Sequence, residues 1–205
     1  MSNPARPSRA VVTTRWWWVR HAPVREDNGC IYGQKDLGCD TSDRVVFEAV
    51  GKILPRNAVW VSSNLKRTHQ TADAIWAAGF PRPAAMAQEA ALAEQHLGQW
   101  QGMNRAAFIA SRPVGSHWFA DIGEPAPGGE SFMDLYNRVR GAILRINAEH
   151  AGRDVIAVAH FGRIVADSSL CQPFVCPSSG TAPSGVGEVQ TVTRQFRRRC
   201  VRARS

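Results

Sequence analysis

Short apolar runs, separated by longer segments with helical periodicity, dominate residues 15–160 of the chain. Three of these runs, Arg15–Val19, Ala58–Val61 and Asp154–Ala159, are rich in Val, Ile, Trp and Ala. Such runs are typical of strands that are covered on both faces of a sheet. We therefore expect the tryptophan run Trp16–Trp18 to pack in the core rather than to form a platform that stacks bases.

Two segments between these strands carry apolar residues at helical spacing. Ser42 can cap a helix over residues 42–54, and Ser62 or Ser63 can cap a second helix over residues 65–78. The expected buried face of the first helix consists of Val45, Val46, Ala49, Val50 and Ile53.

The longest amphipathic segment follows Ser131 and predicts a helix over residues 131–150 that ends before Gly152. Its apolar face consists of Phe132, Leu135, Val139, Ile143 and Ile146. Because strands alternate with helices along the chain, the pattern predicts an α/β layered fold.

Length and composition favour a single folded domain. The chain has 205 residues, of which 44% are hydrophobic, enough for a sizeable core. We expect a disordered N-terminus over residues 1–14, the domain over residues 15–170, and an irregular basic tail over residues 171–205. The net charge of +8 favours anionic partners, although six Arg between Arg194 and Arg204 supply much of it.

The cysteines and the apolar runs exclude several kinds of site. The five Cys are scattered and form no CxxC pair, so neither a zinc site nor a disulfide framework is expected. No apolar run reaches the length of a membrane span, and the N-terminus lacks a secretory signal. We therefore expect a cytoplasmic protein with reduced thiols, without a membrane partner and without a metal or cofactor.

Polar residues suited to phosphate follow each of the three strands. The first strand ends in Arg20 and His21, the second is followed by Arg67 one helical turn later, and the third ends in His160. Ligands of open α/β sheets bind outside the carboxyl ends of the strands. If the strands are parallel neighbours, these side chains converge on one site.

Two His and two Arg in one site suit a phosphate dianion. Arg binds phosphate oxygens through its planar fork, and a neutral imidazole can attack phosphorus to form a covalent intermediate. This chemistry needs no metal, but it needs a carboxylic acid that protonates the leaving alcohol.

Five motifs, in one order over roughly residues 15–165, resemble the histidine phosphatase superfamily, which is also called phosphoglycerate mutase-like. They are Val19–Pro23, Ser62–Ala72, Leu92–Glu94 with Gly98–Gly102, Pro127–Ser131 and Val158–His160. The resemblance implies a three-layer α/β/α sandwich around a mostly parallel sheet.

The same resemblance implies the roles of five residues. His21 would be the nucleophile that becomes phosphohistidine, while Arg20, Arg67 and His160 would bind the phosphoryl group. Glu94 matches the family's acid, which protonates the leaving group and then activates water.

Three departures from the family's pattern bear on the fold and the function. Ala22-Pro23 replaces the usual Gly after the first His and, like the loop Ile31–Gln34, is similar to the α-ribazole phosphatase-like branch. Phe161 follows the second His, where the family usually has Gly. After Leu170 the composition changes abruptly to Ser, Pro, Gly and Cys, so we expect a divergent and incomplete C-terminal part of the fold.

The leading functional hypothesis is a phosphomonoester hydrolase that acts on a small phosphorylated metabolite, with α-ribazole 5′-phosphate as the substrate suggested by the branch. A phosphoglycerate mutase is the first alternative, although only 25 positions separate Gly102 from Pro127 (127 − 102), which leaves little room for a mutase lid. The second alternative is a catalytically impaired relative whose basic tail binds nucleic acid through electrostatics. Base-specific motifs are absent, so nucleic acid is not the expected partner.

Overall fold

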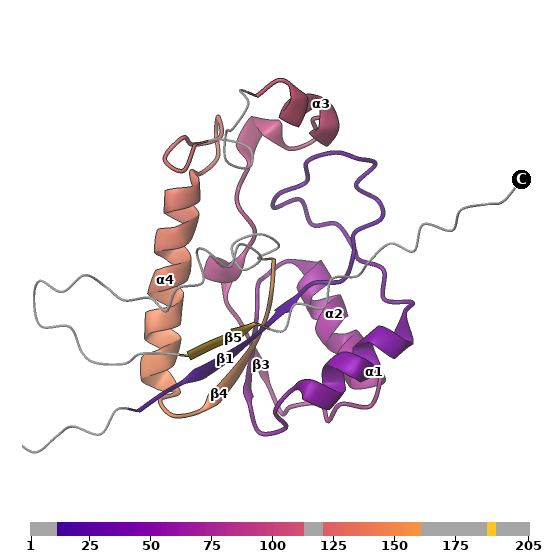
Figure 1. The fold of residues 1–205 in the computed structure, drawn as a ribbon, viewed down its shortest axis with the longest axis vertical. Coiled ribbons are helices and arrows are strands. Elements are labelled where there is room, and N and C mark those ends of the chain that lie inside the picture. The colour runs from indigo at the N-terminus through magenta and orange to yellow at the C-terminus, as the bar shows by residue number, and fades with distance from the viewer. Residues whose placement is uncertain (1–11, 113–120, 161–187, 192–205) are drawn as a thin grey trace, which may run out of the picture.

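A parallel β-sheet forms the centre of the molecule (Figure 1). The computed structural model describes residues 12–112, 121–160 and 188–191. The five strands lie in the order β3-β2-β4-β1-β5, and every pair is parallel. The strands are β1 (Arg15–Arg20), β2 (Val59–Ser62), β3 (Met86–Gln88), β4 (Asp154–Ala159) and β5 (Glu188–Thr191).

One face of the sheet is covered by α1 (Arg44–Ile53) and α2 (Lys66–Ala77). Their apolar side chains pack on strand residues that point to this face, such as Trp60 and Ile156. Trp60 is almost completely buried, and its ring contacts Phe80 at 5.5 Å between centroids.

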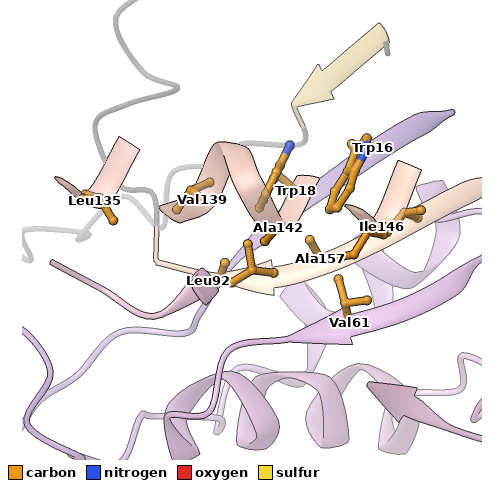
Figure 2. Packing of buried hydrophobic residues seen from close by; sticks show 11 residues of the cluster. Trp16, Trp18, Val61, Leu92, Leu135, Val139, Ala142, Ile146 and Ala157 are labelled. Carbon is orange, nitrogen blue, oxygen red and sulfur yellow. The ribbon is translucent and has the colours of Figure 1, made fainter. Parts of the chain in front are cut away.

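The other face is covered by α4 (Phe132–Glu149), which lies along the sheet (Figure 2). Trp16 and Trp18 point to this face and stack on each other with 5.1 Å between ring centroids. Both rings are buried, so the prediction that the tryptophans belong to the core is confirmed. Helices on both faces of a parallel sheet give the predicted three-layer α/β/α fold.

The helix α4 follows its predicted pattern closely. Ser131 caps it within a capping box, in which the Ser131 hydroxyl and the Asp134 carboxylate bind each other's backbone N–H. Leu135, Val139 and Ile146 are buried on the sheet, as the periodicity predicts.

The predictions for α1 and α2 need correction at their caps and faces. Asp43 rather than Ser42 caps α1. The N-cap residue of α2 is Leu65, which makes no side-chain cap bond, and the N–H of Lys66 donates instead to Asp36 at 2.7 Å. In α1, Val50 is buried as predicted, but Phe47 is buried as well and Val45 is 73% exposed, so the helix is rotated partly away from the predicted face. The large Phe47 ring buries more apolar area than a Val side chain and determines which side faces the sheet.

Short elements connect the two halves of the fold. The 3₁₀ helices η1 (Ala90–Leu92) and η2 (Gly98–Trp100) follow β3, and α3 (Arg105–Ala110) comes next, capped by Asn104. The segment between η1 and η2 contains Glu94 and lies at the carboxyl end of the sheet.

The two ends of the chain lie mostly outside the described residues. This holds for residues 1–11 of the predicted disordered N-terminus and for most of the predicted tail, residues 171–205. That predicted tail also contains the strand β5, which pairs in parallel with β1 from Glu188 to Thr191. Among the helices described, none is both long and apolar enough to cross a bilayer.

Candidate active site

The carboxyl ends of β1 and β4 bring the two site histidines together. The register pairs Arg20 with Ala159, so His21 and His160 each follow the last paired residue of neighbouring parallel strands. The backbone N–H of His21 donates to the carbonyl of Ala159 at 2.9 Å, and the two imidazole rings lie 5.0 Å apart between centroids. The topology thus produces the convergence expected from the strand ends.

The tautomer of His21 follows from one hydrogen bond. Its Nδ1 lies 2.7 Å from the carbonyl oxygen of Ala22, which can only accept, so Nδ1 carries the proton. Nε2 therefore carries a lone pair; it is buried and has no hydrogen-bond partner among the residues that the structure describes.

The environment of His21 keeps its ring neutral. Burial lowers the pKa of His21 to about 3, and the positive charges of Arg67 and Arg20 act in the same direction, against the bond to Ala22. At neutral pH the ring is therefore an uncharged imidazole with its Nε2 lone pair available.

His160 is held in place by two side chains. The Nε of Arg67 donates to Nδ1 of His160 at 3.2 Å, so the other ring nitrogen carries the proton and donates to the Oγ of Ser63 at 2.6 Å. Burial, with further contributions from His21 and nearby Arg residues, lowers the pKa of His160 well below its ordinary value.

Arg67 is completely buried and extends from the first turn of α2. Its two terminal nitrogens donate to the carbonyls of Gly33 and Lys35, each at 2.8 Å, and its guanidinium lies 5.2 Å from the centre of the Tyr32 ring. The loop after β1 therefore fixes the orientation of the guanidinium and keeps its charge beside His160.

Arg20 differs from Arg67 in its surroundings. It is the last residue of β1 and is exposed to solvent. Its charge nevertheless lowers the pKa of both His21 and His160, so it contributes to the positive field at the site.

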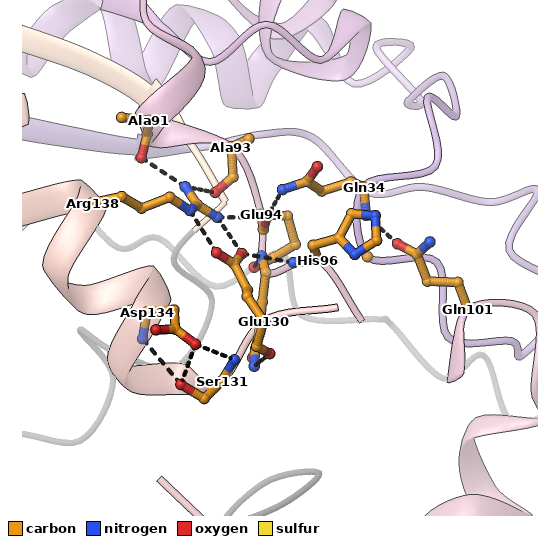
Figure 3. Close-up of polar contacts among 12 residues, drawn as sticks. Gln34, Ala91, Ala93, Glu94, His96, Gln101, Glu130, Ser131, Asp134 and Arg138 are labelled. Atoms are coloured by element: carbon orange, nitrogen blue, oxygen red, sulfur yellow. Dashed lines mark hydrogen bonds and ion pairs between the residues drawn. The ribbon is translucent and has the colours of Figure 1, made fainter. Parts of the chain in front are cut away.

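Glu94 is the acidic residue of the site. Burial raises its pKa, and this effect outweighs the opposing bond from the N–H of Gln95 to its Oε1 (3.0 Å) and the charges of Arg67, Arg20 and Arg138. The carboxyl group is thus shifted toward its protonated form, which a general acid requires. Its backbone carbonyl accepts hydrogen bonds from Gln34 and Arg138 (Figure 3).

The sequence reasoning missed two residues that support this site. Ser63 was expected only as a helix cap, yet its hydroxyl contacts His160; its place directly after a strand was the available signal. Arg138 lies outside the apolar face predicted for the helix, so the sequence alone gave it no role. In the described part of the chain, no three His, Cys, Asp or Glu side chains group closely enough to hold a metal ion.

The sequence and the fold resemble those of known phosphatases. Glucosyl-3-phosphoglycerate phosphatase of Mycobacterium tuberculosis is 33% identical over 163 residues, which cover 74% of this chain and 72% of that protein. Phosphoglycerate mutase-like protein 4 of Arabidopsis thaliana is 35% identical over 107 residues, covering 50% of this chain and 45% of the plant protein.

Solved structures agree with these relatives. A mycobacterial glucosyl-3-phosphoglycerate phosphatase in complex with VO3 matches with a TM-score of 0.55 and 27% identity, over 70% of this chain and 74% of that chain. An Escherichia coli protein provisionally assigned as an α-ribazole-5′-P phosphatase matches with a TM-score of 0.57 over 72% and 74% of the two chains. Its identity of 19% shows a shared fold only.

The family assignment rests on the length of chain that matches. Residues 16–170 match the histidine phosphatase superfamily (branch 1), a range that contains both histidines, both arginines and Glu94. The chain therefore belongs to branch 1 of the histidine phosphatase superfamily.

Proposed function

We propose that this protein is a phosphomonoester hydrolase that transfers the phosphoryl group of its substrate to Nε2 of His21. The single observation that carries the proposal is the state of that nitrogen. The Nδ1 proton is engaged by the carbonyl of Ala22, burial keeps the ring neutral, and the lone pair of Nε2 is unused among the described residues. These are the properties of an activated nitrogen nucleophile.

In the first half-reaction, the Nε2 lone pair of His21 attacks phosphorus as the bond from phosphorus to the ester oxygen breaks. The carboxyl group of Glu94 gives its proton to the departing alkoxide, which leaves as the alcohol. Arg20 and the remaining N–H groups of Arg67 donate to the equatorial oxygens and stabilise the charge of the transition state. His160 adds a further donor when its N–H turns from Ser63 to the phosphoryl group.

In the second half-reaction, the Glu94 carboxylate accepts a proton from a water molecule, which attacks the phosphorus of phosphohistidine. The P–N bond breaks, inorganic phosphate leaves, and His21 regains its lone pair while Glu94 is again protonated. The cycle consumes one ester and one water, and its steps use only these side chains. We therefore propose that hydrolysis does not require a metal.

The substrate that we propose is a small phosphorylated metabolite. Glucosyl-3-phosphoglycerate is tested first, since the relatives named for it are 33% identical and match most of the chain. α-Ribazole 5′-phosphate is tested beside it, because the Ala22-Pro23 form after the nucleophile suggests that branch. The short stretch between Gly102 and Pro127 favours hydrolysis over isomerisation, which a coupled assay for phosphoglycerate mutase activity checks.

The experiment that tests the function is a turnover assay with p-nitrophenyl phosphate. We expect hydrolysis that orthovanadate inhibits, because vanadate imitates the transferring phosphoryl group, and that EDTA leaves unchanged. His21→Ala abolishes it. Full activity in His21→Ala, or loss of activity in EDTA with recovery on adding a divalent metal, would contradict the proposal.

A further inference from the structure

Arg138 on α4 forms hydrogen bonds to the backbone around Glu94 (Figure 3). An arginine has five N–H donors, and here all five are used. Nη1 donates to the carbonyls of Ala91 (2.7 Å) and Ala93 (2.9 Å). Nη2 donates to the carbonyl of Glu94 (2.9 Å) and to Oε1 of Glu130 (2.6 Å), while Nε donates to Oε2 of Glu130 (2.9 Å).

Glu130 extends this contact to the other side of Glu94. Its Oε1 also accepts from the backbone N–H of His96 at 2.8 Å, and its own N–H donates to the carbonyl of His96 at 2.9 Å. The side-chain amide of Gln95 donates to the Glu130 carbonyl at 3.1 Å. Arg138 and Glu130 therefore hold the main chain immediately before and after Glu94.

The position of this main chain decides where the carboxyl group of Glu94 lies. Among the described residues, the Glu94 side chain accepts a hydrogen bond from the neighbouring N–H of Gln95 alone, so it moves with the backbone that carries it. The Glu94 carbonyl accepts from Gln34 (2.8 Å) as well as from Arg138, so two elements fix it from different directions.

A purely stabilising ion pair would not have this geometry. Arg138 and Glu130 are mostly buried and form a bidentate pair, but three of the five donors bind carbonyls of one short segment instead of a second acid. Three hydrogen bonds thus restrain one short segment, and a catalytic group must be held within about 0.5 Å of its productive position.

We propose that Arg138 is a positioning residue for catalysis, which holds the main chain at Glu94 so that its carboxyl group meets the leaving-group oxygen. The proposal rests on the function proposed above, in which Glu94 is the general acid. A misplacement of about 1 Å at such a group lowers a rate by about 100-fold.

The dependence of the rate on the leaving group separates positioning of the acid from general stability. p-Nitrophenolate leaves without protonation, whereas phenolate, a stronger base, benefits from the proton of Glu94. The ratio kcat/KM reports the steps up to cleavage of the P–O bond. For Arg138→Met we expect kcat/KM to fall by about 10- to 100-fold with phenyl phosphate, and several-fold less with p-nitrophenyl phosphate.

Two further variants test the five-bond geometry. Arg138→Lys keeps the positive charge but offers three donors without a planar fork, so we expect the same selective loss. Glu130→Gln removes the ion pair without changing shape and is expected to give a weaker loss of the same kind. It also keeps the test open if Arg138→Met does not fold.

A matched control separates stability from positioning. Ile146→Ala removes a buried side chain near the other end of α4 and destabilises the same helix without touching the segment of Glu94. It is expected to leave the ratio of the two kcat/KM values unchanged at temperatures where the protein is folded.

The double variant Glu94→Gln/Arg138→Met tests whether Arg138 acts through Glu94. If Arg138 acts through Glu94, the double variant shows no greater selective loss than Glu94→Gln alone. Equal losses with both substrates in Arg138→Met, full recovery in Arg138→Lys, or additive losses in the double variant would overturn the proposal. A wild-type protein that hydrolyses neither ester would instead refute the proposed function.

Discussion

His21 and Glu94 share one cause for opposite shifts of their pKa. Burial disfavours the charged form of each, so it lowers the pKa of the imidazole and raises that of the carboxyl group. Burial thus favours a neutral imidazole at His21 and shifts Glu94 toward its protonated form, the two states that the proposed phosphoryl transfer needs. Pairs of titratable groups whose pKa values are shifted apart by their environments are typical of acid–base sites.

The pH dependence of kcat/KM with phenyl phosphate tests this pair. Raising the pH through the elevated pKa of Glu94 removes the proton that the leaving group needs, so activity falls on the alkaline side. Protonation of His21 occurs only near pH 3, so above pH 5 it contributes no acid limb. In Glu94→Gln the alkaline limb due to Glu94 is absent, while titration of the substrate is common to both enzymes. An unchanged profile in Glu94→Gln would contradict the assignment.

Ser63 offers a second test at this scale. Ser63→Ala leaves the N–H of His160 without its partner in a buried place, which costs about 1–3 kcal/mol. We expect a lower free energy of unfolding in urea and a lower kcat/KM. Ser62→Ala is the matched control, since that buried hydroxyl faces His69 instead. Equal activity of the two variants would show that Ser63 does not support the site.

The sequence predicted that His21, Arg67 and His160 lie together, but it did not predict the hydrogen bonds that they form. The strand-end positions of His21 and His160 and the place of Arg67 could be inferred from the apolar runs alone. The tautomer of His21 could not, because it depends on how the backbone of Ala22 turns after β1.

At the scale of elements, the helix α4 and its N-terminal turn connect the core to the site. The turn before the helix packs so closely on η2 that a Cβ on Gly98 would lie 2.1 Å from the carbonyl oxygen of Pro127. Gly98 also has a positive φ of 44°, which disfavours other residues. The capping box, the turn and the segment of Glu94 therefore form one connected unit.

Two glycine substitutions test this unit. Gly98→Ala is expected to lower the thermal midpoint and the kcat/KM with phenyl phosphate, because the turn must move away from η2 and takes Glu130 with it. Gly141→Ala in α4 is the control: nothing lies within 4 Å of the added methyl group, and alanine favours the helix by about 1 kcal/mol. A stable, fully active Gly98→Ala would contradict the close packing seen here.

The periodicity of apolar residues predicted where helices and strands lie better than it predicted which helix face is buried. The ends of β4 and the cap of α4 agree with the predictions, because a run of buried residues and a capping box are strong local signals. The predicted face of α1 is confirmed at Val50 but wrong at Val45 and Ile53, because the larger Phe47 is buried on the sheet.

At the scale of the whole molecule, the order of the strands creates the site. β4 lies between β2 and β1, so the ends of all three strands, which carry the site residues, are neighbours. β5 lies within the segment predicted to be an irregular tail, because Glu188–Thr191 contains no run of apolar residues that would predict a strand.

The pairing of β5 with β1 gives a prediction about stability. Deleting residues 171–205 removes β5 and leaves β1, which His21 directly follows, as an edge strand. We expect a lower free energy of unfolding and a greater tendency to aggregate. The shorter deletion of residues 192–205 retains β5 and is expected to behave like the full chain. Equal stability of the two truncated proteins would contradict the described role of β5.

The central claim, covalent catalysis at His21, is tested most directly by trapping the intermediate. Glu94→Gln is mixed with p-nitrophenyl phosphate, quenched in base, where phosphohistidine is stable, and analysed by peptide mass spectrometry. We predict one phosphoryl group on the peptide containing His21, labile to acid, and none in the double variant His21→Ala/Glu94→Gln. A phosphoryl group on another residue, or turnover in His21→Ala equal to that of the wild type, would contradict the account.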